Sequence, residues 1–143
     1  IRAGNECQFG NLDIGITASC ASNFNLPRGL TTGVYYLGAW ADPYNAITES
    51  SETNNGRATT NTLTVNTLTA TKTGSGTVTS DPSGINCGSD CVAAFLKDAT
   101  ATLTATPATG WQFAGWSGCD TASGATCTVK MTAPKTVNAT FGL

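Results

Sequence analysis

The chain has 143 residues, of which 40% are hydrophobic and only 11% are charged. This composition is too apolar for a disordered tail and too poor in charge for a typical cytosolic domain. Its seven basic and nine acidic side chains are scattered singly and give a net charge of −2, so no basic stripe is present to bind nucleic acid or an anionic membrane surface. We therefore expect no nucleic-acid partner and no membrane insertion.

Cysteine usage indicates where the protein works. The chain has six cysteines, no histidine and many Thr, Ser, Asn and Gly residues, a combination typical of an oxidising, extracellular environment. We expect a secreted protein, free or at the cell surface. The chain has no apolar run of the roughly 18 residues that a membrane span requires, and it begins at Ile1 without a charged-then-apolar leader. Either a leader has been removed or the sequence starts inside a longer precursor.

The first part of the chain contains several strand patterns. Apolar and polar residues alternate over residues 12–18 and 24–26, as in half-buried strands. Residues 33–41 (GVYYLGAWA) are apolar at nearly every position, which predicts a central strand covered on both faces. A stretch rich in turn-forming residues follows, so the chain should reverse and bring residues 58–65 (ATTNTLTV) back beside that strand.

The strand pattern restarts at residue 68, with Asn66 and Thr67 as the only candidate linker, so we expect a stiff rod of two modules. No segment has the period and caps of a helix, and the predicted fold class is all-β. The later strands are predicted at residues 68–72, 77–80, 91–96, 100–106, 111–116, 126–131 and 136–141. The side chains predicted to face the core are Val78, Phe95, Leu103, Trp111, Phe113, Val129, Met131, Val137 and Phe141.

The first half carries a motif of aromatic, acidic and amide residues followed by a Thr-rich strand. Its residues are Gly33, Val34, Tyr35, Tyr36, Asp42, Ile47, Glu49, Glu52, Asn54, Asn55 and residues 59–65. In this order they resemble the closing half of the bacterial cell-adhesion-related (CARDB) domain. The resemblance implies a partial immunoglobulin-like β-sandwich over residues 1–66.

The second half carries a motif that spans nearly all of residues 67–143. It consists of residues 74–78 (GSGTV), Pro82, residues 84–85, Cys87, Cys91, residues 103–105 (LTA), residues 113–118 (FAGWSG), Cys119, Cys127, Met131 and residues 137–141. This motif resembles the divergent internalin-type B-repeat. The resemblance implies a small β-grasp-like module of the kind found in tandem on bacterial surface proteins.

The first module is too short for the family that it resembles. Immunoglobulin-like sandwiches have about 100 residues, so the opening strands of the module over residues 1–66 are missing. A sandwich without these strands exposes apolar surface and unpaired backbone. Either the sequence is part of a longer chain, or a neighbouring subunit donates the missing strand and builds a filament.

The cysteine spacing favours three local disulfides: Cys7 with Cys20, Cys87 with Cys91, and Cys119 with Cys127. Such disulfides would stabilise small modules whose cores are limited in size. The alternative is a zinc site formed by the last four cysteines. Their spacing and the lack of histidine fit zinc poorly, so we expect no bound metal and no cofactor.

A catalytic function is not expected. Without histidine the chain lacks the usual general base of serine and cysteine nucleophiles. Glu49 and Glu52 could form a glycosidase pair, but they lie in a turn with no aromatic cleft evident around them. Together with Asp42 and Asn54 they also offer oxygen ligands for calcium, although capping of backbone amides in a tight corner explains them better.

Two aromatic residues, Tyr44 and Trp116, are candidates for surface rings that stack on sugars. The other tyrosines and tryptophans are expected in the core. We therefore expect a non-enzymatic structural or adhesive module of a bacterial surface protein, self-associating as a filament subunit or within a longer adhesin. The alternative is an accessory module of a secreted hydrolase that binds a surface glycan or the matrix.

Overall fold

A computed structural model of the protein describes residues 26–41, 48, 53 and 55–143. These residues form two five-stranded sheets and no helix, which confirms the predicted all-β class. In the described part of the chain there is accordingly no helix that could cross a membrane. The strands are β1 (Gly33–Trp40), β2 (Gly56–Thr73), β3 (Gly76–Asp81), β4 (Asn86–Cys87), β5 (Val92–Leu96), β6 (Thr100–Pro107), β7 (Gln112–Ser117), β8 (Thr121–Ser123), β9 (Thr126–Lys130) and β10 (Lys135–Gly142).

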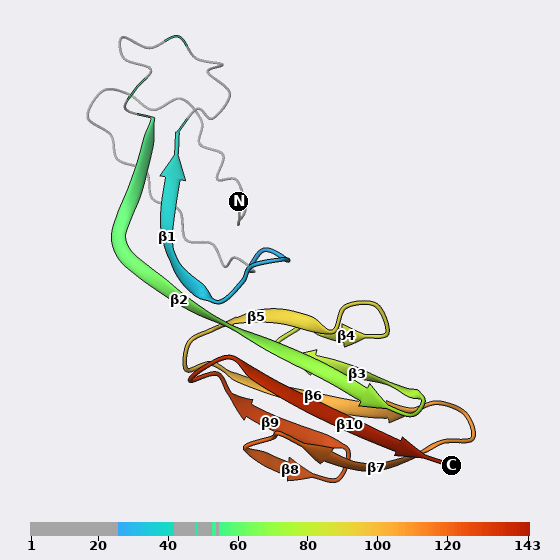
Figure 1. Ribbon diagram of the computed structural model, residues 1–143. Coiled ribbons are helices and arrows are strands. Elements are labelled where there is room, and N and C mark those ends of the chain that lie inside the picture. Colours follow the sequence, from blue (N-terminus) through green and yellow to red (C-terminus); the bar gives the residue numbers. More distant parts are fainter. Residues whose placement is uncertain (1–25, 42–47, 49–52, 54) are drawn as a thin grey trace.

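The first sheet is organised around β2, a long bent strand that passes from β1 into the two-sheet body (Figure 1). β1 pairs antiparallel with the first part of β2, and β10 pairs parallel with its last part. β5 pairs antiparallel with the middle of β2, while β7 pairs with β10. Val65 pairs with Gly33 of β1 and with Leu96 of β5, so β1 and β5 lie on opposite edges of β2.

The second sheet has the order β4-β3-β6-β9-β8 and is antiparallel throughout. It packs against the first sheet through one hydrophobic core, to which β2, β5 and β10 contribute from one side and β3, β6 and β9 from the other. Seven of the nine side chains predicted to face the core are buried, and the other two, Trp111 and Phe113, are partly buried against it. The period-two pattern therefore predicted the core correctly.

The buried face of β2 changes sides at Val65 and Asn66. Leu63 and Thr64 are both half-buried and Val65 is buried, whereas after this point the even-numbered Leu68 and Ala70 enter the core. Val65 and Asn66 are adjacent and both buried, and the Asn66 side-chain amide donates a hydrogen bond to the Met131 carbonyl oxygen at 2.7 Å. One strand thus serves two packing environments on its opposite faces.

The linker predicted at Asn66 and Thr67 is wrong, because β2 runs through both residues without a break. Asn66 pairs with Phe95 of β5 and Thr67 pairs with Ala94. This pairing holds the backbone of both residues extended, although their short polar side chains are typical of a linker. The division into modules at residues 66 and 67 stays a prediction. A continuous strand rather than a joint connects the two parts.

The prediction for β1 is partly wrong. Residues 58–65 of β2 do return antiparallel beside it, as predicted, and the pairing extends back to Gly56. However, Val34 is 58% and Tyr36 is 67% exposed, so β1 is not covered on both faces. Within the described residues β1 pairs only with β2 and forms an edge of its sheet, and for this reason its second apolar face has no layer against it.

The other strands agree with their predicted ranges to within one or two residues, except that 58–65 and 68–72 join into one strand. The short strands β4 and β8 were not predicted, because two or three residues are too few to show an alternating pattern. The strand predicted over residues 12–18, and all but Leu26 of that over residues 24–26, lie outside the described residues.

Candidate functional site

Two of the three predicted disulfides are present, and both are local. Cys87 is bonded to Cys91 with their Cα atoms 4.3 Å apart, and Cys119 is bonded to Cys127 with a Cα separation of 5.6 Å. Cys87 and Cys127 are buried in the core, so each disulfide ties a surface loop to it. These four sulfur atoms are bonded in pairs and are not free thiolates for zinc. The predicted pair of Cys7 and Cys20 lies outside the described residues.

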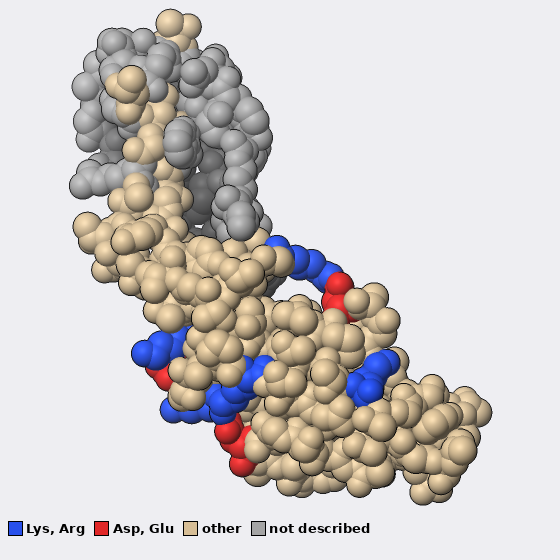
Figure 2. Space-filling view, viewed as in Figure 1, with Lys and Arg blue, Asp and Glu red and all other residues tan. Residues whose placement is uncertain are grey.

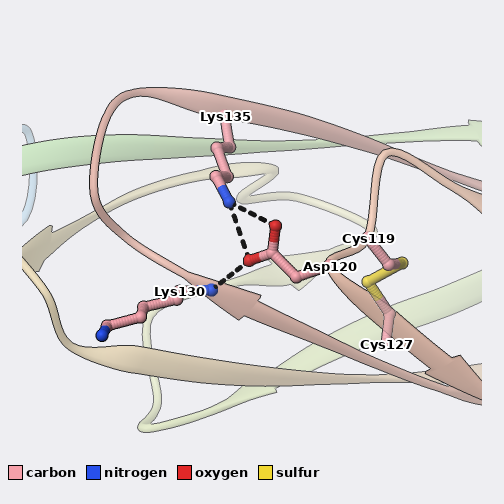
Figure 3. Close-up of polar contacts among 5 residues, drawn as sticks. All are labelled: Cys119, Asp120, Cys127, Lys130 and Lys135. Atoms are coloured by element: carbon pink, nitrogen blue, oxygen red, sulfur yellow. Dashed lines mark hydrogen bonds and ion pairs between the residues drawn. A yellow bond between two sulfur atoms is a disulfide. The ribbon is translucent and has the colours of Figure 1, made fainter.

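Asp120, next to the second disulfide, joins three segments (Figure 3). Its two carboxylate oxygens lie 2.6 and 2.7 Å from the Lys135 Nζ, and one of them accepts a hydrogen bond from the Lys130 backbone N–H at 2.6 Å. The hydrogen bond from Lys135 is the largest cause that lowers the pKa of Asp120, followed by that from Lys130. The group therefore stays ionised at neutral pH and links the start of β10 to the end of β9 rather than acting as a proton donor.

Trp116, a predicted sugar-binding ring, packs against the hydrophobic core from β7. Its ring lies 5.6 Å from that of Phe113, centroid to centroid, and Phe113 in turn contacts Phe141. The indole Nε1 is buried and has no hydrogen-bond partner in the structure. Trp116 therefore belongs to an aromatic cluster and is partly buried, and its role in sugar binding stays a prediction.

Several other predicted site residues cannot be placed. Tyr44 and the acidic corner of Asp42, Glu49, Glu52 and Asn54 all lie outside the described residues. Within the described part of the chain, no group of three or more His, Cys, Asp or Glu side chains is arranged to hold a metal ion. The calcium alternative for that corner stays a prediction.

A cavity of about 620 Å³ lies between β5 and residues 26–31. We call it the β5 groove. Leu26, Pro27 and Leu30 line it from one side, and residues 92–96 line it from the other. Arg28 forms an ion pair with Asp90, both of which also line the groove. Sequence reasoning missed this site because its two sides are more than sixty positions apart in the chain.

Residues 26–32 are held over the sheet mainly by packing and hydrogen bonds. Leu30 is buried, and Gly29 has a positive φ of 79° that favours glycine at this turn. The Thr32 hydroxyl lies 3.1 Å from the Thr67 hydroxyl and accepts a hydrogen bond from the Thr67 backbone N–H. The Arg28 and Asp90 side chains are largely exposed, so their ion pair contributes little. The groove therefore has one side built on β5 and one anchored at Leu30 and Thr32.

Large exposed hydrophobic side chains concentrate on two strands. Val34 and Tyr36 lie on β1, while Val92 (56% exposed) and Leu96 (39% exposed) lie on β5. On the face of the molecule shown in Figure 2, charged side chains are few among the coloured residues. Neither strand contains a charged residue or proline, the devices by which natural proteins prevent sheet edges from pairing. β1 and β5 are therefore the candidate interaction surface of the described structure.

Comparison with known proteins identifies the second half of the chain. The family model of the divergent InlB B-repeat domain matches residues 66–143, which extend from the middle of β2 through β10. No curated protein and no solved structure matches the chain significantly. The resemblance of residues 33–65 to the CARDB family lies outside the match and stays a prediction.

The family and the disulfides agree on the environment of the protein. Disulfides persist in oxidising compartments, and a B-repeat of this type indicates an extracellular or surface module. The matched segment contains nine of the ten strands in whole or in part, including both sheets of the body. Because the match covers more than half of the sequence, this chain belongs to the divergent InlB B-repeat family.

Proposed function

We propose that the chain is a non-enzymatic structural or adhesive module of a bacterial surface protein, which associates with copies of itself through the edges of its sheets. The observation that carries the proposal is the position of Val34, Tyr36, Val92 and Leu96, exposed on two uncharged edge strands. Exposed edges of this kind pair readily with other strands. The family match supports the surface location.

The chemistry of the described side chains supports a non-enzymatic role. The whole sequence has no histidine, and the pKa of Asp120 is lowered, opposite to the shift that a general acid at neutral pH requires. In the β5 groove the charges of Arg28 and Asp90 neutralise each other. The groove therefore offers apolar contacts and backbone groups, which suit binding rather than catalysis.

The test is the mass of the protein in solution. Light scattering over a wide range of concentrations should show an average mass that rises above the 14.5 kDa of one chain, and electron microscopy should show linear assemblies at high concentration. A single species with the mass of one chain at every concentration would rule out self-association.

One observation favours glycan binding as a second candidate. The Tyr36 ring is 67% exposed on β1, where it could stack on a sugar. Binding on a glycan array that disappears in Tyr36→Ala and persists in Thr104→Ala, a change at an exposed position on β6, would support an accessory module. Absence of binding by the unchanged protein would leave self-association as the better proposal.

A further inference from the structure

We infer that the free edge of β5 accepts the free edge of β1 from a second copy of the chain, so that copies join head to tail. This inference rests on the proposed self-association and specifies its two surfaces. Both edge strands are apolar and uncharged, and they lie on opposite edges of β2 in one sheet.

The backbone of β5 has a row of unpaired groups. The Lys97 N–H donates to the Thr64 carbonyl oxygen, and the Ala70 N–H donates to that of Cys91, so the odd-numbered residues of this segment direct their backbone groups toward β2. Because successive residues of a strand alternate, Val92 and Ala94 direct their N–H and C=O groups away from β2. In the described part of the chain neither residue has another backbone partner. A strand added here would satisfy these groups.

The groove beside this edge suits an uncharged, extended strand. Val92 and Leu96 form part of its lining, and Leu26, Pro27 and Leu30 form the apolar side opposite. Arg28 and Asp90 are paired with each other, so the groove presents no net charge to an occupant. A charged strand would lose its hydration there without gaining an ionic partner.

β1 meets these requirements. Its eight residues, GVYYLGAW, carry no charge and no proline, and one of its edges pairs with β2 while the other has no strand beside it among the described residues. Val34 and Tyr36 project from it into solvent. The remaining edges are less suitable, because β4 and β8 have two and three residues and β7 follows a register shift in its pairing with β10.

The positions of the two edges predict a head-to-tail assembly. β1 and β5 lie on opposite edges of β2, as the double pairing of Val65 shows. If β1 of one copy pairs with β5 of the next, the assembly as a whole keeps a free β1 edge at one end and a free β5 edge at the other. A contact between two different surfaces continues until the ends meet or the material is exhausted, which gives a ring or a filament.

The experiment uses one double variant for each edge, together with a control. Val34→Lys with Tyr36→Lys charges β1, Val92→Lys with Leu96→Lys charges β5, and Thr104→Lys adds a charge at an exposed position on β6, away from both edges. Ala94→Pro removes one outward N–H of β5 without adding charge. Sedimentation velocity measures assembly, and circular dichroism spectra check that every variant is folded.

The inference predicts that each edge variant weakens self-association by about tenfold or more, because pairing would bury an unpaired lysine, while Thr104→Lys associates normally. The decisive sample is an equimolar mixture of the β1 and β5 variants. Each supplies the edge that the other lacks, so the mixture should form dimers of one copy of each and nothing larger.

Other results would overturn the inference in distinguishable ways. If the unchanged protein is monomeric at all concentrations, the proposed self-association fails as well. If it associates but the edge variants associate equally well, or Thr104→Lys is equally impaired, the function stands and these two edges are not the contact. If the mixed variants remain monomeric, or only one edge matters, the edges do not pair with each other.

Discussion

The two ends of β2 show how differently one strand can be used. Both are rich in threonine and both are paired with neighbours, yet residues 58–62 are exposed whereas Leu68 and Ala70 are buried. The difference is a second layer: the last part of β2 is covered by the sheet of β3, β6 and β9, and the first part forms a ladder with β1. Pairing with neighbouring strands extends the sheet along the whole of β2, but the side chains of a strand are buried only where a second sheet covers their face.

This contrast should be visible in stability. The two-sheet body has the continuous core and both described disulfides, whereas the β1–β2 ladder exposes Val34 and Tyr36. Segments with few buried contacts open at lower free energy than the core of the same protein. We therefore expect amide hydrogens of the ladder to exchange faster than those of β6 and β9.

The largest loss should follow removal of the second disulfide. Cys119→Ala with Cys127→Ala opens a loop with a sequence separation of 8, and chain entropy predicts a free energy of unfolding lower by about 2.5 kcal/mol. Denaturant unfolding measures this loss, and hydrogen exchange shows which strands lose protection. A variant as stable as the wild type would show that packing alone holds the body together.

A pair of valine variants tests the contrast directly. Val129→Ala on β9 removes two buried methyl groups and should lower the free energy of unfolding by about 2 kcal/mol. Val34→Ala on β1 removes the same groups from a 58% exposed side chain, and should lower it by less than about 0.5 kcal/mol. Equal losses in urea unfolding would mean that Val34 is covered in solution.

The change of buried face at Asn66 can be tested with a second pair. Asn66→Ala removes the buried hydrogen bond to Met131 and should cost about 1 kcal/mol, since the Met131 carbonyl still accepts from the Asp98 N–H. Asn61→Ala on the exposed part of the same strand is the control and should be nearly neutral. If both variants lose the same amount, Asn66 has no special role in joining the two parts.

The smallest effect is expected at Asp120. Its pKa is lowered in the folded state, so its contribution to stability is present above the ordinary aspartate pKa of about 4 and is lost as the pH falls through the folded value. Asp120→Asn should therefore show a shallower decline in melting temperature than the wild type below about pH 4. Parallel declines would mean that other carboxylates account for the acid sensitivity.

Period-two alternation predicted the strands of the body except β4 and β8, and the nine side chains that it placed inward are buried or partly buried in the core, because a sheet with one covered face leaves that signal in the sequence. The same reasoning predicted β1 as a central strand because its residues are apolar. Among the described residues β1 instead pairs only with β2 and lies at an edge of its sheet. This reasoning also missed the β5 groove, because no local pattern marks residues 26–31 and 92–96 as neighbours. Alternation also gave no sign that Trp116 contacts Phe113, because residues three apart fall on opposite faces of a regular strand, whereas the pairing of β7 with β10 is irregular between Phe113 and Gly115.

The sequence by itself determined the all-β class, the inward side chains of the body and the two local disulfides, since all three depend on residue types and short spacings. Only the tertiary structure decided that Asn66 and Thr67 continue a strand, that the buried face of β2 changes at Val65 and Asn66, and that β1 and β5 are uncharged edges on opposite sides. The reason is physical: alternation specifies which side chains share a face of a strand, but only the packing of distant segments specifies which face is covered and which edge stays open.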